Sequence, residues 1–378
     1  MLITIHENSA GHAVGDIVDI VCEDDLLSFD NISVLSPKHL TRSQYKGVIR
    51  ECTGSSFTIS VELYAHLHGH TDNSLLDGMS KVKDYVENTT AVSAMTDHGN
   101  LYGMVEFFKT MKKKGKKAII AFEAYVEDPL TGKLSNMHTC LFAKDQVGYK
   151  NLLKLCSRAY EYTYRGHPHI TDELMQKYHE GIIASSACLA GPVQRYLESG
   201  QYDQSKQVLE YYLGIFGKDN FYLEVQRHGI ESEPIVEEGL IRLSKEYGLP
   251  IICTTDSHYT HKSDKSAHEV LLCLQTGKTM NEPHMRFPGD GYWIHTSEEV
   301  EELFADHPEW LDNTLALAER CSAEVPLGDI NLPKFDIPAP FTSSDEYFKH
   351  LCAKGFRQRF EGKPEYSDPE YHKRYDYE

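Results

Sequence analysis

The sequence predicts an α/β protein: a barrel of seven strand–helix units, (β/α)7, with a small β-rich unit before it and a helical extension after it. Two observations favour this fold class. Short apolar runs alternate with helical patterns from residue 61 onward, and side chains able to bind metals lie near the ends of most runs. Repeated strand–helix units give parallel strands, which tend to close into a barrel. An open doubly wound sheet stays a second interpretation, because alternation alone does not prove closure.

The composition limits the class of protein. The 378 residues include 38 Lys and Arg against 57 Asp and Glu, a formal net charge of −19. This charge argues against a broad basic surface for nucleic acid, and any DNA must be met at a local pocket or held by another part of an assembly. No run reaches the ~18 apolar residues of a membrane span and the N-terminus lacks a signal-peptide pattern, so we expect a cytoplasmic protein with no membrane partner. The nine cysteines are scattered and never form Cys-x-x-Cys, which argues against a disulfide framework or a zinc ribbon.

Four regions succeed one another along the chain. Residues 1–60 contain short β-branched runs separated by turn-forming residues, and their role is unknown; Asp24–Asp25 is expected to be a solvated turn. Residues 61–275 carry the strand–helix alternation. Residues 276–340 read as a helical extension with a proline-rich linker, and residues 341–378 as the start of a further region. We expect the chain to be a piece of something longer.

Seven apolar runs supply the predicted barrel strands. They are Glu62–Leu67, Ala91–Thr96, Ala118–Ala124, Thr139–Phe142, Gly181–Ser185, Asn220–Val225 and Leu249–Thr254. Helical spacing of apolar residues comes after most of them, as in Leu101–Lys114, whose three final lysines and adjoining Gly115 are typical of a helix C-terminus. Helices are also predicted over Ser297–Phe304, Leu311–Cys321 and Ser343–Arg359.

Residues able to bind metals cluster near the strand ends. They are His66, His68, His70, Asp72, Asp77, Asp97, His98, Glu123, His138, Cys188, Asp256 and His258. Each alone is weak evidence, but the C-terminal ends of parallel barrel strands open on one rim, where these side chains would meet. His138 is the exception, since it precedes its strand. Either that strand runs antiparallel, or a loop carries the residue inward.

These side-chain types limit the chemistry. Imidazole, carboxylate and a single thiolate suit zinc, manganese or iron, and their number fits two or three ions better than one. Clustered divalent ions suit the attack of an activated water on a phosphate ester. The sequence contains neither a P-loop nor a Gly-x-Ser-x-Gly elbow, and no Asp-x-Asp pair of the kind that a two-metal polymerase centre can show.

Five blocks carry a family resemblance. Residues 66–78 (HLHGHTDNSLLDG) resemble the opening of the PHP (polymerase and histidinol phosphatase) domain found in bacterial DNA polymerase III alpha subunits. Residues 96–101, 122–126, 187–191 and 255–259 are similar to its later blocks in the same order, and residues 267–340 are similar to the segment after the domain in replicative polymerases. The resemblance covers about residues 62–378, and the first 60 residues depart from it.

The resemblance implies a set of metal ligands and catalytic residues. The implied ligands are His68, His70, Asp77, His98, Glu123, His138, Cys188, Asp256 and His258, and the implied catalytic residues among them are Asp256, His258, Glu123 and His98. Glu123 would lie between two ions, and the cofactors would be divalent ions, about three of Zn²⁺ or Mn²⁺ or else Fe²⁺. His66 and Asp72 would be neighbours rather than ligands.

The resemblance also implies a function. All nine positions keep a residue able to bind metal, which implies a phosphoesterase acting as a 3′→5′ exonuclease on the 3′ end of a DNA primer strand, with the other polymerase domains or subunits of a replicase as partners. Arg227 and His228 are candidates for contacting the phosphate, and a surface role for each is an equal alternative. The polymerase carboxylates would lie beyond this chain, so we expect no DNA synthesis from it alone.

Two other functions stay open. The first is a structural and interaction module in which metals stabilise the barrel without catalysis. The second is a free-standing phosphatase for a small phosphate ester, which the long segment after residue 260 disfavours.

Overall fold

The computed structural model describes residues 2–5, 17–23, 26–29, 32–35, 44–53, 56–328, 330 and 332–378. The chain divides into two compact units, Met1–Val325 and Pro326–Glu378, and each is described by itself. No helix among the described residues is both long and apolar enough to cross a membrane.

A six-stranded antiparallel sheet forms the first part of the chain. Its strands are β1 (Leu2–Ile5), β2 (Ile17–Glu23), β3 (Leu26–Phe29), β4 (Ile32–Leu35), β5 (Gln44–Thr53) and β6 (Ser56–Glu62), in the order β1-β6-β5-β2-β3-β4. The predicted β-rich character of residues 1–60 is therefore present. The turn predicted at Asp24–Asp25 lies outside the described residues.

The second sheet carries the predicted barrel. Its strands are β7 (Val92–Met95), β8 (Lys117–Glu127), β9 (Leu134–Ala143), β10 (Thr163–Tyr164), β11 (His167–Ile170), β12 (Ile182–Ser185), β13 (Phe221–Val225) and β14 (Ile251–Cys253). The long strand β8 pairs in parallel with β7 and then with β11 along one side, and it pairs antiparallel with β9 along the other. Parallel pairs β12–β13–β14 continue the sheet beyond β9. Most of β8 is buried, as its nearly continuous apolar sequence predicts.

Residues 63–70 close the ring between β7 and the end of β14. The His66 amide donates to Val92 O at 3.2 Å, and the Ala94 amide donates back to His66 O at 2.8 Å. On the other side, the His70 amide donates to Ser257 O at 2.7 Å. The predicted first strand is thus present as an irregular segment with isolated parallel bridges rather than as a regular strand. Together with β7, β8, β9, β12, β13 and β14 it completes the predicted seven-membered barrel, and the open-sheet alternative is wrong.

One strand direction departs from a uniform parallel barrel. Strand β9 runs antiparallel to both β8 and β12, and His138 lies opposite Tyr125 in the register. This settles the choice that the sequence leaves open for His138, because an antiparallel strand begins at the rim where its neighbours end.

No pattern in the sequence indicates the short β10–β11 hairpin, which adds β11 beside the far half of β8.

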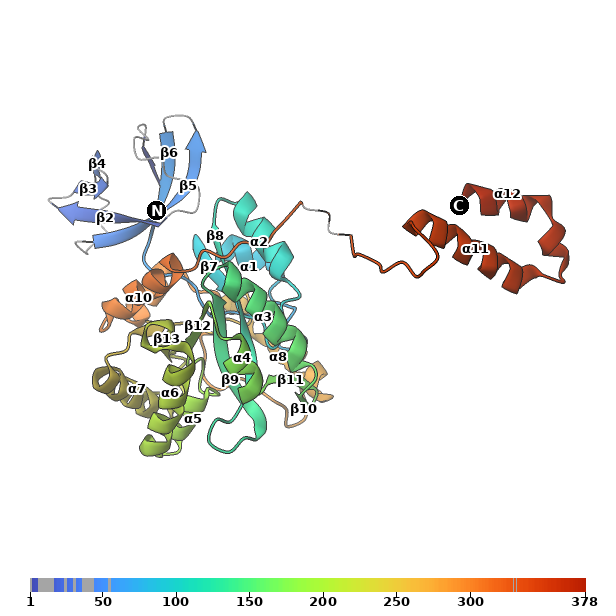
Figure 1. Cartoon of the computed structure of the whole chain (residues 1–378). Helices are drawn as coiled ribbons and strands as arrows, with labels where there is room; N and C mark the ends of the chain where they lie inside the picture. Colours follow the sequence, from blue (N-terminus) through green and yellow to red (C-terminus); the bar gives the residue numbers. More distant parts are fainter. Residues whose placement is uncertain are drawn as a thin grey trace. The chain divides into compact units, whose positions relative to one another are not determined.

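Ten α-helices are described in the first unit. They are α1 (Val82–Asn88), α2 (Met104–Lys113), α3 (Gln146–Ala159), α4 (Asp172–Tyr178), α5 (Pro192–Glu198), α6 (Tyr202–Phe216), α7 (Glu233–Tyr247), α8 (Lys265–Thr276), α9 (Ser297–Leu303) and α10 (Pro308–Glu319). Figure 1 shows α3 to α7 around the outside of the strands. Helix α10 packs against β14 and β7, and Asn313 donates to Ile251 O at 2.7 Å. Helix α10, which lies after residue 275, thereby belongs to the outer layer of the barrel.

The second unit contains α11 (Ser344–Phe360), a short 3₁₀ turn at Pro364–Ser367 and α12 (Pro369–Tyr377). Ser343 caps α11 by accepting a hydrogen bond from the Glu346 amide at 3.2 Å. Neither helix contains a buried residue. This small unit therefore contributes no core of its own within the described part of the chain.

A glycine contact between α3 and the start of β12 offers a test of the packing. A Cβ on Gly148 would lie 1.7 Å from Gly181 O, a backbone atom that cannot yield easily. We expect Gly148→Ala to lower the free energy of unfolding by about 1–3 kcal/mol, the range for an overpacked site. Gly214→Ala, in α6 with no atom near the added Cβ, should instead raise it by about 0.5–1 kcal/mol. Urea denaturation measures both, and equal midpoints for the two variants would contradict the contact.

Candidate metal centre

The barrel brings all nine implied ligands into one group at one rim. Residues 63–70 supply His68 and His70, and the turn after them supplies Asp77. Strands β8 and β9 supply Glu123 and His138 from opposite directions. The segments after β7, β12 and β14 supply the remaining members, which are His98, Cys188, Asp256 and His258.

Glu123 lies at the centre, with a side chain that is 1% exposed. Its Oε1 lies 3.3 Å from His68 Nε2, 3.2 Å from His138 Nδ1 and 3.6 Å from Cys188 Sγ. Its Oε2 faces a different neighbour, His98, whose Nδ1 lies 2.8 Å away. The two carboxylate oxygens therefore face two different ligand groups, the arrangement that a bridging carboxylate requires.

Asp256 completes the group on the other side of the two buried histidines. Its Oδ1 lies 3.1 Å from His70 Nε2, 3.3 Å from His68 Nε2 and 3.6 Å from His258 Nδ1. Asp256 has a positive φ of 44°, an uncommon conformation for a residue other than glycine. Such strained backbone is often found at functional sites.

Asp77 faces the more exposed side of the cluster. Its carboxylate oxygens lie 3.1 Å from His98 Nε2 and 3.8 Å from His258 Nε2. The His70 ring stacks between those of His98 and His258, with centroids 4.2 and 4.3 Å away. The side chains of Asp77, His98 and His138 are 17%, 12% and 14% exposed, whereas those of His68 and His70 are fully buried. The centre therefore opens to solvent on the side of Asp77, His98 and His138.

Buried polar atoms without hydrogen-bond partners show that the residues fit divalent ions. Buried polar atoms normally find a partner, and each exception needs an explanation. Six of the buried atoms that make no hydrogen bond of ordinary geometry, despite the short distances given above, belong to this cluster: His70 Nε2, Asp77 Oδ1, His98 Nδ1, Glu123 Oε2, Asp256 Oδ1 and His258 Nε2. Several overlapping sets of three ligand atoms lie within 4.8 Å of one another there. The thiol in these sets is that of Cys140, whereas Cys188 Sγ lies 3.6 Å from both Glu123 Oε1 and His138 Nδ1. Imidazole nitrogens and carboxylate oxygens in such sets suit zinc, manganese or iron.

The electrostatics of the cluster hold its carboxylates and His70 in the forms that bind cations, whereas neighbouring acidic groups, against the effect of burial, raise the pKa of His68 and His98. Burial, together with the neighbouring His98 and His258, lowers the pKa of His70 to about 3, so its ring is neutral at pH 7. Burial alone would raise the pKa of Glu123 and Asp256, but the surrounding histidines hold the pKa of both well below its usual value. The site thus offers charged carboxylates and a neutral imidazole at neutral pH.

The other residues from the same motifs have different roles. Asp97 accepts hydrogen bonds from the Thr71 amide at 2.7 Å and from Ser74 Oγ at 2.9 Å, which fixes the turn after His70. His66 Nε2 lies 3.0 Å from Ser257 Oγ, and Asp72 pairs with Lys81 at 2.5 Å. His66 and Asp72 are therefore neighbours of the cluster, as the family resemblance implies.

Arg227 and His228 have all their nitrogen groups engaged elsewhere. The Arg227 guanidinium donates to Glu237, to Asp306 and to Leu303 O through its three nitrogens. The two His228 ring nitrogens lie 3.1 Å from Glu233 Oε1 and 3.0 Å from Thr255 O. The phosphate role of both residues stays a prediction, and these contacts favour the structural alternative.

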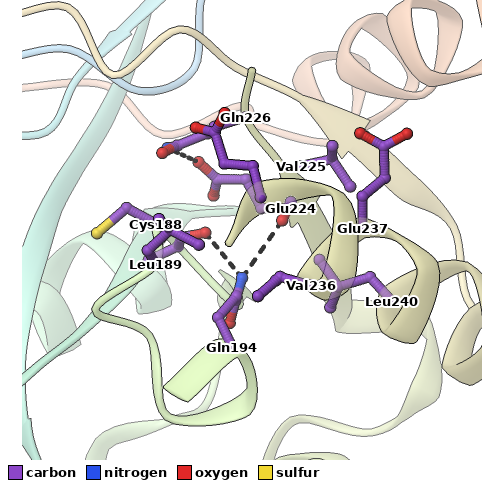
Figure 2. Close-up of a pocket in the computed structure, with 11 residues that line it drawn as sticks. Cys188, Leu189, Gln194, Glu224, Val225, Gln226, Val236, Glu237 and Leu240 are labelled. Carbon is purple, nitrogen blue, oxygen red and sulfur yellow. Dashed lines mark hydrogen bonds between the residues drawn. The ribbon is translucent and has the colours of Figure 1, made fainter. Parts of the chain in front are cut away.

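Glu224 is a buried carboxylate that the sequence motifs do not reveal. It lies within β13, its side chain is fully buried, and its Oε1 lies 2.6 Å from His68 Nδ1. Ser185 and Thr254 donate to its carboxylate at 2.5 and 2.6 Å. Figure 2 shows its neighbour Gln226, whose amide nitrogen donates to Glu224 Oε1 at 3.1 Å. Glu224 thereby holds the His68 ring with Nε2 directed at the cluster, as a carboxylate behind a metal-binding histidine does.

A single signal in the sequence marks Glu224. It is the one charged residue in the apolar run Phe221–Val225, and a buried charge persists only where it has partners. Nothing in the sequence identifies that partner, because His68 lies 156 positions earlier.

Comparisons with known proteins agree with this geometry. Residues 66–228 match the model of the PHP domain. DNA polymerase III subunit alpha of Campylobacter jejuni is 38% identical over 352 residues, which cover 83% of this chain and 29% of that protein. The corresponding proteins of Borreliella burgdorferi and Thermus aquaticus are also 38% identical, over 79% of this chain and 27% and 26% of their own lengths. A solved structure from Bifidobacterium adolescentis, described as a candidate metal-dependent phosphoesterase, aligns with a TM-score of 0.33 at 13% identity over 64% of this chain and 95% of its own, too weakly to carry an argument.

The match defines first a class of domain. Residues 66–228 belong to the PHP domain family, a metal-dependent hydrolase type, and the side chains gathered there could hold divalent cations. About four fifths of the chain is homologous to the N-terminal region of DNA polymerase III subunit alpha. It spans about a quarter of the length of the curated relatives that it matches.

Replacing Glu224 tests its hold on His68. We expect Glu224→Gln to weaken metal binding about 10- to 100-fold, because a neutral amide orients and polarises the imidazole less well than a carboxylate. Competition with a chelator of known affinity measures the change. Glu238→Gln, an exposed position on α7, is the matched control and should bind as the original protein does. Equal metal affinities for the two variants would show that Glu224 does not orient His68 for metal binding.

Proposed function

We propose that this chain is the PHP-domain portion of a replicative DNA polymerase and removes nucleotides from the 3′ end of a DNA strand as a metal-dependent proofreading exonuclease. The observation that carries the proposal is the group of six unpartnered buried atoms, which come from separate segments and face one small volume. The polymerase relatives supply the substrate class, DNA, and the expected partners, which are the other domains or subunits of a replicase.

The ligand set determines the roles of the residues in this proposal. His68, His70, Glu123 and Asp256 form the buried floor, and His98, His138, Asp77, Cys188 and His258 complete the wall. Divalent ions held there would supply an activated water and neutralise the charge that develops on the phosphate. Glu123, with one oxygen toward each ligand group, is the residue that would hold two ions at a fixed separation.

The open side of the centre determines how a phosphodiester would approach. Asp77, His98 and His138 retain exposure there, so the terminal phosphate would reach the cluster past these side chains. The His167 ring stacks on Tyr125 at 4.5 Å, and Tyr125 in turn contacts the rings of His98 and His138. His167 therefore stands beside the entrance with polar nitrogens that would orient the phosphate or the leaving hydroxyl.

The acidic composition is compatible with this substrate. DNA would be recognised through its terminal phosphate at the cluster, while the remaining domains of a polymerase would hold the duplex. The four predicted catalytic residues, Asp256, His258, Glu123 and His98, all lie in the cluster, and their roles in the reaction stay part of this proposal.

A structural role for the metals is the second candidate. The observation that favours it is that the ligands come from separate segments around the barrel and that several are fully buried, so bound ions would join those segments. The two candidates differ in turnover, since only the first releases nucleotides.

Nucleotide release measures the proposed activity. With Mn²⁺ or Zn²⁺, the chain should shorten a 5′-labelled single strand from its 3′ end one nucleotide at a time, and Asp256→Asn with His258→Ala should lower the rate at least about 100-fold, because two ligands of the cluster are lost. Lys83→Ala, an exposed residue on α1, is the control and should keep the rate. Undiminished release by the double variant would defeat the assignment, and bound metal without any release would favour the structural role.

Metal stoichiometry gives an independent check. Nine ligands at roughly three or four per ion predict about three equivalents of divalent metal in the purified protein. Elemental analysis of the chain after extensive dialysis measures this number. One equivalent or fewer would show that the nine residues do not act as a single cluster.

A further inference from the structure

A cavity lies next to the metal centre, between α8 and the segment after it. Its volume is about 290 Å³, and its floor is formed by the buried side chains of Tyr259, His268, Leu272 and Tyr292. Phe287 forms one wall. Apolar and aromatic lining with a few polar groups is typical of a small-molecule site.

One aromatic ring separates this cavity from the cluster. The Phe287 ring meets the His258 ring edge to face, with centroids 4.6 Å apart. The same Phe287 ring contacts His268 and Tyr292, both at 4.9 Å. His268 Nε2 lies 2.7 Å from Asp77 O, so the cavity floor is bonded directly to a second member of the cluster. Whatever binds in the cavity therefore lies one ring away from a group bound at the metals.

The charges at the rim do not favour a phosphate in the cavity itself. Lys265 lies 3.2 Å from Asp290, and Arg286 pairs with Glu269. Each cation is thus compensated by a neighbouring carboxylate. The Tyr259 hydroxyl is buried and has no hydrogen-bond partner of ordinary geometry among the described residues, which leaves a polar group that a ligand could satisfy. A flat, uncharged ring with polar edges fits this combination better than an anion does.

We propose that the cavity is the binding site for the nucleobase of the nucleotide whose phosphate occupies the metal centre. The inference rests on the proposed function and deepens it. A nucleotide joins a flat ring to a phosphate through a sugar, and this chain places an aromatic cavity and a phosphate-binding cluster on the two sides of Phe287. Stacking on aromatic side chains tolerates every base, which suits an enzyme that removes nucleotides without regard to sequence.

The test separates the contribution of the base from that of the phosphate. Deoxythymidine 5′-monophosphate and deoxyribose 5-phosphate carry the same phosphate, and only the first has a base. With the Mn²⁺-loaded chain, calorimetric titration should show the nucleotide binding about tenfold more tightly than the sugar phosphate. Phe287→Leu, which keeps bulk beside His258 but removes the aromatic face, should reduce this ratio severalfold and leave the affinity for the sugar phosphate unchanged. Phe348→Leu, at an exposed position of α11, is the matched control and should keep the full ratio.

Each other outcome overturns the inference. A ratio of one in the original protein, an equal loss of both affinities in Phe287→Leu, or no binding of either ligand would each contradict a base site in this cavity. Metal content measured on Phe287→Leu must match the original, so that a lost ratio is not a lost cluster. A different result would contradict the proposed function: the nucleotide would still bind more tightly than the sugar phosphate, but no nucleotide would be released from DNA. Release from DNA together with a ratio of one would instead leave the function intact and remove the base site.

Discussion

The buried carboxylate of Glu123 is the interaction on which the arrangement of the site depends. A carboxylate taken out of water is costly unless positive charge or hydrogen-bond donors surround it. Here it lies among imidazoles, with His68 and His138 near one oxygen and His98 near the other. These partners come from residues 63–70, from β9 and from the segment after β7, so the barrel must close for Glu123 to be compensated. The closed barrel brings the partners of Glu123 together, and these partners in turn make the buried carboxylate of Glu123 tolerable in the barrel.

Strand β8 carries Glu123 and is paired on both sides, which places the carboxylate among its partners. It is long enough to pair with β7 through its first half and with β11 through its second, while β9 covers its other side. Glu123 lies in the middle of this strand, and an isolated bridge joins it to His98 beyond the end of β7. The centre of the cluster is thereby placed on the most extensively paired strand, where the backbone is least free to move.

Much of this could be predicted from the sequence, because the side chains at the ends of parallel strands must converge. The direction of β9 could not, since the alternation of apolar residues is the same for a strand read either way. Residues 63–70 were harder to assign for a related reason. They are buried throughout and rich in histidine, so they lack the alternation that marks a strand, and their bonds to β7 and to Ser257 are few. Glu224 could not be identified as a site residue from the sequence, because its role depends on a contact with His68 that no motif spacing reveals.

The charge of the whole chain and the chemistry of its site together indicate where a phosphate could bind. A net charge of −19 opposes long-range attraction of the chain to the DNA backbone. The cluster itself contains three carboxylates and a thiol, so without cations it would repel a phosphate as well. Under the proposed function, two or three divalent ions would more than offset those three carboxylates and reverse the sign of the local potential at that one place. Affinity for a phosphate would then be confined to the rim that holds the ions, and the buried network behind it, from Glu224 through His68 to Glu123, would determine where that positive potential lies.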